Sequence, residues 1–176
     1  MSNMIEPYAI PVVAWVKSRM SQEKRPTIVC CSTLATVVAV AEDLSDAGNV
    51  VTITGQTPRS DFLAALRPGE EDNPTIIVAT KGRILTGFMV QWPKAYVTAA
   101  TKLNVADAVQ LMGRPRDALN QRTLTAYFPV LAPAFGWVDI AGYVNNEVHG
   151  MLRPYQFDSM VDKDFSFNMP RGETQS

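Results

Sequence analysis

The chain has 176 residues, of which 47% are hydrophobic and 19% are charged. This composition supplies a sizeable core for one domain of ordinary size and argues against a disordered chain. The net charge of −1 argues against a protein that coats nucleic acid in bulk through a uniformly basic surface.

In chain order, apolar side chains at helical spacing first predict a covering helix over residues 6–20. Short apolar, β-rich runs predict buried strands over residues 27–32, 50–54, 75–79, 95–100 and 123–128. Helical patterns between and after these strands predict helices over residues 33–46, 58–66, 104–113 and 134–152. Strands that alternate with helices predict an α/β fold, a three-layer structure in which helices flank a parallel β-sheet.

The predicted organisation has a central domain over residues 26–130. A covering helix precedes it within residues 1–25, and a second helix follows it within residues 131–152. Residues 153–176 have little periodicity, and we expect this tail to wrap the surface or to be mobile.

Cysteine and histidine usage predicts neither a disulfide nor a metal site. Cys30 and Cys31 are adjacent, and neighbouring residues of a strand point to opposite faces, so a bridge between them would be strained. We therefore expect buried thiols in a reducing compartment. His149 is the only histidine, and no metal-ligand spacing occurs. The chain begins with no secretory pattern and has no apolar run of transmembrane length, so we expect a cytoplasmic protein.

Charge is distributed unevenly along the chain. Residues 75–122 hold seven basic and two acidic residues, a local balance of +5. Residues from 133 onward hold three basic and six acidic residues, a balance of −3. A basic centre can bind an anion locally while the whole chain stays near neutral. We also expect the acidic end to shield this centre, so that truncation after Leu152 raises the affinity for nucleic acid.

Residues 26–44, PTIVCCSTLATVVAVAEDL, place small hydroxyl residues between a predicted strand and a predicted helix. The hydroxyl of Ser32 or Thr33, together with the N–H groups of a helix N-terminus, suits a phosphate. The structural alternative is that one of these residues only caps the helix.

Residues 78–87, VATKGRILTG, follow the third predicted strand. We predict a loop here, in which Gly82 and Gly87 permit close approach of the backbone to a phosphate. Lys81 and Arg83 add positive charge. The structural alternative is a simple turn.

Residues 109–117, VQLMGRPRD, end the fourth predicted helix with two arginines. Arg114 and Arg116 place two guanidinium groups directly after this helix. The structural alternative is a helix C-terminus whose basic residues complement the helix dipole.

The order of these three segments resembles the second, C-terminal RecA-like domain of superfamily 2 helicases, over roughly residues 26–128. Within this superfamily, the sequence resembles phage helicases and branch-migration enzymes most. The resemblance implies a RecA-like, P-loop NTPase-type fold and a replication-related role. The nucleic-acid contacts that it implies fall on Ser32, Thr33, Thr80, Lys81, Gly82, Arg83, Thr86 and Gly87.

The third segment is similar to the family's motif VI, Gln-x-x-Gly-Arg-x-x-Arg. Gln110, Gly113 and Arg114 match this pattern, which implies an arginine-finger role for Arg114 and Arg116. Arg116 comes one residue early and Asp117 stands at the family's position, a departure that weakens the expectation of ATP hydrolysis.

Missing motifs predict that the chain alone does not hydrolyse ATP or unwind a duplex. No Gly-x-x-x-x-Gly-Lys-Ser/Thr stretch occurs, and no Asp-Glu pair follows an apolar strand. We therefore expect no first, ATP-cradling RecA-like domain on this chain and no cofactor for the chain alone. ATP and magnesium would bind only at a site shared with a partner.

These features lead to three functional hypotheses. The chain is a stand-alone helicase C-terminal-like domain, a viral accessory protein in the host cytoplasm that binds single-stranded nucleic acid or a helicase or replication partner. Alternatively, it is one half of a split ATP-dependent helicase, whose partner carries the Walker motifs. The third hypothesis is a structural or inhibitory protein on a degenerate helicase fold. Base stacking by Trp92, Trp137, Tyr96 or Phe88 is an option, although core packing is the commoner use of such residues.

Overall fold

The computed structural model describes residues 4–58, 60, 63, 66–87, 90–103, 105–115, 122–129 and 164–169. Its helices are α1 (Ala9–Gln22), α2 (Leu34–Asp43), α4 (Lys81–Gly87) and α5 (Val105–Met112). Its strands are β1 (Thr27–Cys31), β2 (Asn49–Ile53), β3 (Gly69–Glu70), β4 (Asn73–Thr80), β5 (Lys94–Ala99), β6 (Arg122–Tyr127) and β7 (Asp164–Met169). No helix within these ranges is both long and apolar enough to cross a membrane.

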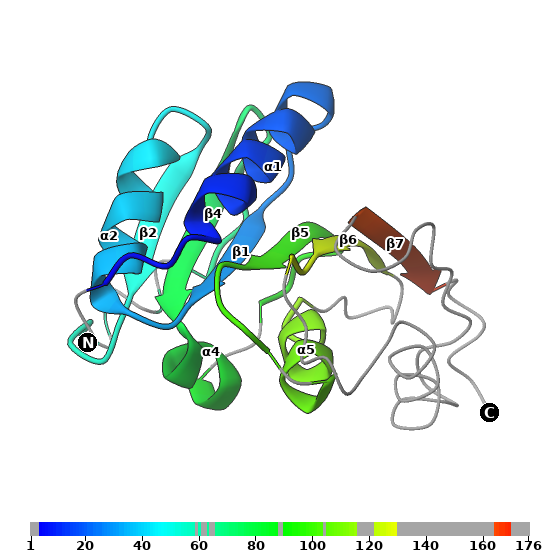
Figure 1. The fold of residues 1–176 in the computed structure, drawn as a ribbon. Helices are drawn as coiled ribbons and strands as arrows, with labels where there is room; N and C mark the ends of the chain where they lie inside the picture. Colours follow the sequence, from blue (N-terminus) through cyan, green and yellow to red (C-terminus); the bar gives the residue numbers. More distant parts are fainter. Residues whose placement is uncertain are drawn as a thin grey trace.

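The strands form a mostly parallel sheet in the order β2-β4-β1-β5-β6-β7 (Figure 1). β1 lies at the centre and pairs in parallel with β4 on one side and with β5 on the other. β7 is antiparallel to β6, and the short β3 pairs antiparallel with the beginning of β4. The predicted α/β fold is therefore confirmed.

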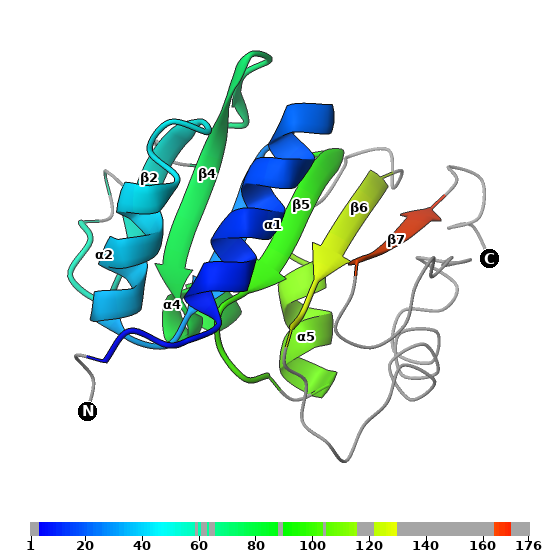
Figure 2. The same ribbon diagram turned by 45° about the horizontal axis from the view of Figure 1, so that its top comes forward.

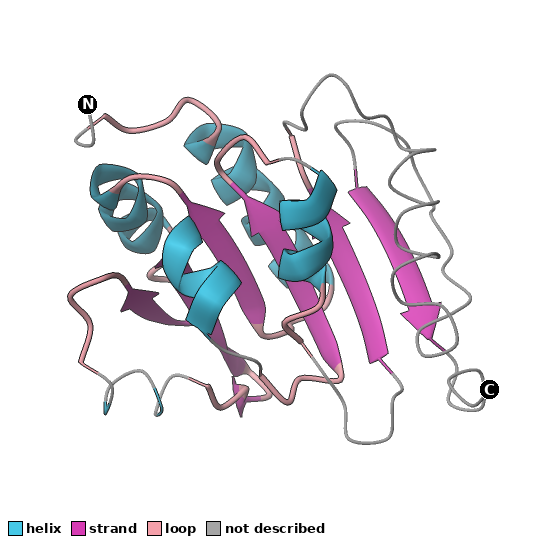
Figure 3. Ribbon diagram, turned by 90° about the horizontal axis from the view of Figure 1, so that it is seen from below, coloured by secondary structure: helices cyan, strands magenta, loops and turns pink. Residues whose placement is uncertain are grey.

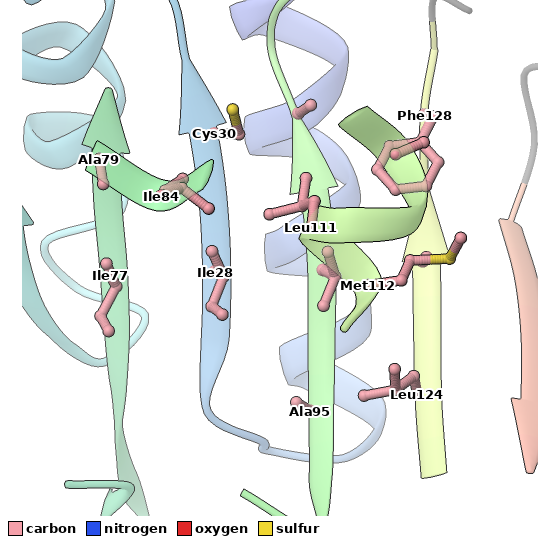
Figure 4. Close-up of a cluster of buried hydrophobic side chains, with 14 of the residues drawn as sticks. Ile28, Cys30, Ile77, Ala79, Ile84, Ala95, Leu111, Met112, Leu124 and Phe128 are labelled. Atoms are coloured by element: carbon pink, nitrogen blue, oxygen red, sulfur yellow. The ribbon is translucent and has the colours of Figure 1, made fainter. Parts of the chain in front are cut away.

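Helices cover both faces of the sheet, which makes the three layers (Figures 1 and 3). One core lies under α1 and α2, where Val12 and Val16 of α1 and Val37 and Val40 of α2 meet alternate residues of the central strands. The other core lies under α4 and α5 and contains Ile84 and Leu111 (Figure 4). Successive residues of a strand point to opposite faces, so fully buried β1 supplies both cores.

The predicted covering helix is present as α1, and aromatic contacts hold it on the sheet. The Trp15 ring stacks on Tyr127 at 5.4 Å between centroids and meets the edge of Tyr96 at 5.7 Å. The Tyr96 hydroxyl donates to the carbonyls of Arg19 and Glu23 at the end of α1. Residues on three strands or helices are thus tied to one another around Trp15, which fixes where α1 lies.

The structure differs from the sequence prediction at three places. Residues 81–87 form the helix α4 and not a loop, because Ile84 is buried against the sheet and the segment turns to bring it there. The short β3 and the strand β7 were not predicted, and β7 shows that part of the tail joins the sheet edge. The predicted helix over 58–66 falls largely, and that over 134–152 wholly, outside the described residues.

Candidate functional site

The register of the three central strands brings residues just beyond their carboxyl ends into one row. Cys31 pairs with Thr80, and Cys30 pairs with Ala99, so Ser32, Lys81 and Thr101 occupy equivalent positions just past the sheet. The connection after β1 crosses one face through α2, whereas those after β4 and β5 lead to α4 and α5 on the other face. Ligands of α/β sheets commonly bind beside such a reversal.

The N-terminus of α2 is built around two threonine hydroxyls. Thr33 is the N-cap, and its Oγ1 accepts a hydrogen bond from the backbone N–H of Thr36 at 3.1 Å. The two threonine Oγ1 atoms lie 2.7 Å apart, and the Thr36 side chain is fully buried. The predicted capping role of Thr33 is confirmed, and Ser32 is exposed directly beside it.

Residues 4–6, which we call the strap, lie across this end of the sheet (Figure 2). The Oγ1 of Thr33 donates to the Met4 carbonyl at 2.7 Å, and the Glu6 N–H donates to the Oγ1 of Thr36 at 2.9 Å. The Ser32 hydroxyl donates to the Glu6 carboxylate, and the Thr101 hydroxyl lies 3.5 Å from the same oxygen. A carboxylate of the chain thus bridges the ends of β1 and β5.

The Glu6 carboxylate is held by hydroxyl groups, and this has an electrostatic cost. Burial raises the pKa of Glu6, and the hydrogen bond with Thr101 offsets this only in part. Neutral hydroxyls stabilise a carboxylate less than a lysine or arginine does. The position therefore directs hydroxyl donors at the carboxylate without neutralising its charge.

Lysines flank the row of hydroxyls. Lys81 begins α4 and pairs with Asp107 of α5, with 2.8 Å between the Lys81 Nζ and the carboxylate. Lys102 follows Thr101 and is exposed. The Lys81–Asp107 pair ties α5 to α4.

Gly82 is exposed, and a Cβ placed on it would meet no atom of the described chain within 4 Å. Packing within the described residues therefore gives no reason for a glycine here. Thr80 and Arg83 are half-buried beside it. Thr86 and Gly87 end α4, so they lie a helix length away from the row at the carboxyl edge.

The structure does not bring the motif VI residues to this row. α5 leads from the end of β5 back toward the beginning of β6, and these strands are parallel. Val90 precedes β5, and its backbone N–H donates to the Arg114 carbonyl at 3.1 Å. Gln110, Gly113 and Arg114 thus lie toward the amino edge of the sheet. Arg116 lies outside the described residues.

The amino edge carries a separate polar cluster. The Arg25 guanidinium lies 4.8 Å from the Tyr96 ring centre and donates to Glu23 at 2.9 Å and Thr125 at 3.2 Å. Lys94 pairs with the other Glu23 oxygen at 2.6 Å. Hydrogen bonds from Arg25 and Lys94 lower the pKa of Glu23 to about 2.

Burial excludes base stacking by Trp92 and Tyr96 and thiol chemistry at the two cysteines. Trp92 is fully buried with its indole N–H donating to the Leu66 carbonyl, and Tyr96 is also buried, so both serve the core. Burial raises the pKa of Cys30 to about 12 and raises that of Cys31 as well, which keeps both thiols protonated and inert. No metal-binding group of acidic, histidine and cysteine side chains occurs among the described residues.

Three residues at this edge, Thr101, Lys102 and Glu6, were not predicted as site residues. Thr101 and Lys102 follow a predicted strand just as Ser32 follows another, so the rule applied to Ser32 would also have found them. Glu6 had no such signal, because its place depends on where the N-terminal segment crosses the sheet.

No protein-family model matches the chain, and no curated protein matches it significantly. Among solved structures, the chain is similar to the Hef helicase domain of Pyrococcus furiosus, with a TM-score of 0.45 and 17% identity over 78% of this chain. It spans 28% of that chain. It is also similar to magnesium protoporphyrin IX methyltransferase from Synechocystis PCC 6803, with a TM-score of 0.35 and 14% identity over 91% of this chain and 76% of that one. Both scores are low, so the α/β assignment rests on the sheet and its flanking helices.

Proposed function

We propose that this chain binds the phosphate backbone of single-stranded nucleic acid at the carboxyl edge of its sheet, as an accessory domain that is not catalytic alone. The observation that carries the proposal is the row formed by Ser32, Lys81 and Thr101 at the point where the strand connections reverse. Hydroxyls and lysines beyond the carboxyl ends of parallel strands are suited to phosphate oxygens.

The sequence resemblance supports the same ligand. In helicase second domains, the segments that match residues 26–44 and 78–87 contact the nucleic-acid backbone. The N-terminus of α2 adds N–H groups and the positive end of the helix dipole, which favour an anion next to Ser32 and Thr33. These segments resemble those of phage helicases. We therefore include a viral accessory role, or a role in replication, in the same proposal.

Among the described residues, the carboxyl edge offers contacts to the phosphates of a nucleic acid and not to its bases. The described row offers hydroxyls and point charges, which bind phosphates without reading bases. The aromatic residues Trp92 and Tyr96 are buried in the core, so they offer no surface for base stacking. We therefore expect affinity that depends strongly on salt and weakly on sequence.

Fluorescence anisotropy of a labelled single-stranded oligonucleotide across a salt series tests the proposal. Lys102→Ala is expected to weaken binding and to reduce the salt slope by about 0.7, the value for one phosphate contact on a single strand. Lys24→Ala is the matched control, because exposed Lys24 lies at the opposite edge and donates to the Asp72 carbonyl. Salt-independent binding, or equal losses in the two variants, would contradict the proposal.

A split ATP-dependent helicase is the second candidate. It is favoured by the accessibility of the end of α5 and the turn after it: Gln110 in the helix is exposed, and Gly113 and Arg114 in the turn are half-buried. A partner with Walker motifs would supply ATP and magnesium, and Arg114 would reach the γ-phosphate across the interface. The test is the ATPase activity of a complex purified from the native host: turnover should fall in Arg114→Ala, and a complex without ATPase activity excludes this candidate.

A further inference from the structure

The strap occupies the same donors that a phosphate would use. The Glu6 carboxylate takes the hydroxyl of Ser32 and lies beside that of Thr101, and the Met4 carbonyl takes the hydroxyl of Thr33. A phosphate oxygen would need these same hydroxyl hydrogens. The strap and a phosphate therefore cannot both bind the row in full.

The strap is attached by polar contacts and not by burial of its side chains. Met4 is 70% exposed and Ile5 is 56% exposed, so neither side chain is anchored in the core. Each hydrogen bond that holds the strap can be exchanged for one with water or with a ligand, so its net contribution is small. Beyond residue 8, by contrast, α1 is held by buried side chains such as Val12 and Trp15.

The helix α1 therefore remains in place when the strap leaves. The hinge would be the short stretch Pro7–Tyr8, since the chain turns there before α1 begins at Ala9. Releasing three residues costs the core no buried side chain of the strap. The same movement exposes the hydroxyls of Ser32, Thr33 and Thr101.

We propose that residues Met4–Glu6 are an autoinhibitory strap, in which the Glu6 carboxylate stands in for a phosphate and must leave before nucleic acid binds the row. This inference rests on the proposed function of the same edge and adds its regulation. The chain then has a closed state, with Glu6 on Ser32, and an open state that binds the ligand. Its apparent affinity is the affinity of the open state multiplied by the fraction of molecules that are open.

The test compares oligonucleotide binding by the wild-type chain, Glu6→Ala and Glu70→Ala in the anisotropy assay. Glu6→Ala removes the side chain that accepts the Ser32 hydroxyl, and we expect an affinity gain of roughly tenfold, as for a row that is open about one-tenth of the time. Glu70→Ala is the matched control, because it removes the same side chain from exposed β3 at the opposite edge. It should change the affinity less than about twofold, because exposed charges beyond a Debye length are screened.

A second measurement separates displacement of the strap from a simple loss of charge. The Glu6 N–H is bonded to the Oγ1 of Thr36, so its hydrogen exchange reports whether the strap is seated. Oligonucleotide added to the wild-type chain should speed exchange at Glu6 and leave exchange at Val16 in α1 unchanged. Binding that leaves Glu6 protected would overturn the strap.

The outcomes distinguish the two proposals. Equal affinity of wild type and Glu6→Ala, in the presence of salt-dependent binding, overturns the strap and leaves the proposed function standing. If neither chain binds the oligonucleotide, the proposed function fails and the strap fails with it. A gain in Glu6→Ala that is absent from Glu70→Ala, together with faster exchange at Glu6 when oligonucleotide is added to the wild-type chain, supports both.

Discussion

The two edges of this sheet hold their polar side chains in opposite ways. At the amino edge, Glu23 is neutralised by Arg25 and Lys94, and the guanidinium is also covered by the Tyr96 ring. At the carboxyl edge, Glu6 is bonded to hydroxyls and its pKa is raised by burial. One edge pairs its carboxylate with cations, and the other holds its carboxylate on neutral hydroxyls.

The two clusters differ in whether their own contacts explain why their residues are charged or polar. At the amino edge, an ion pair with additional hydrogen bonds and a cation–π contact fixes the end of α1 on the sheet. This structural role explains the residues of that cluster without any ligand. A carboxylate on hydroxyls gives no such gain, because the same hydroxyls could bond to water. The four predictions below test the division in order of expected effect.

Arg25→Ala should cause the largest loss of stability, about 2–4 kcal/mol, since it removes a cation–π contact and hydrogen bonds of a charged group. The Arg25 side chain is 11% exposed, so water replaces these contacts poorly. Denaturant unfolding measures the loss, with exposed Lys24→Ala as the control. Under conditions where the variant is folded, its affinity for the oligonucleotide should equal that of wild type. A loss of affinity like that of Lys102→Ala would show that the amino edge also takes part in binding.

Thr33→Ala should cost about 1–2 kcal/mol, because it removes the N-cap of α2, and should also weaken oligonucleotide binding. Thr33→Ser keeps a hydroxyl and should retain most of both properties. Ser32→Ala should change stability by less than about 0.5 kcal/mol, since Ser32 is exposed, while lowering affinity. Chemical denaturation and anisotropy on the three variants check this; full affinity in Ser32→Ala would remove the hydroxyl row from the interface.

The fold was predictable where one signal dominated. Runs such as TIVCC and TIIVA are buried on both faces, so burial and β propensity agree and the strands came out within a few residues. α4 was missed because its glycines indicate a loop locally, whereas the burial of Ile84 depends on packing against distant strands. β7 is separated from β6 by a long stretch of chain, and its pairing has no local signature.

The site was half predictable for the same reason. Ser32 and Lys81 follow strands directly, so a local rule found them, and parallel pairing placed them in one row. Arg114 was expected at the same surface, but a helix that returns to the beginning of the next strand carries its end away from that edge. Glu6 belongs to the row through contacts across 26 residues to Ser32, which no local pattern encodes.

Gly82→Ala should move stability and binding in opposite directions. The position lies in α4, has room for a Cβ and is exposed, so alanine should stabilise the fold by about 0.5–1 kcal/mol. If the ligand backbone approaches this position closely, the added methyl group should weaken oligonucleotide binding several-fold. Gly48→Ala is the contrasting variant, because its Cβ would lie 2.5 Å from the Pro74 carbonyl oxygen and should destabilise the fold. Unchanged affinity in Gly82→Ala would place the ligand away from α4.

The smallest expected effect is a difference in pH dependence between the two glutamates. The folded-state pKa of Glu23 is about 2, below the ordinary value of 4.5, so its contribution is present above pH 4.5 and is lost as the pH falls toward 2. The folded-state pKa of Glu6 is raised, so its contribution is present below pH 4.5 and is lost as the pH rises through the folded value.

Unfolding free energies of wild type, Glu23→Gln and Glu6→Gln, measured from pH 3 to pH 7, separate these two slopes. The loss of unfolding free energy in Glu23→Gln, relative to wild type, should be greatest at neutral pH and should shrink on acidification. The unfolding free energy of Glu6→Gln should instead rise relative to wild type as the pH rises. The second trend matters most, because it shows that a charged Glu6 opposes folding and that the strap is held against an electrostatic cost. If both variants lose stability in parallel at neutral pH, Glu6 is a structural carboxylate like Glu23, and the two edges do not differ in kind.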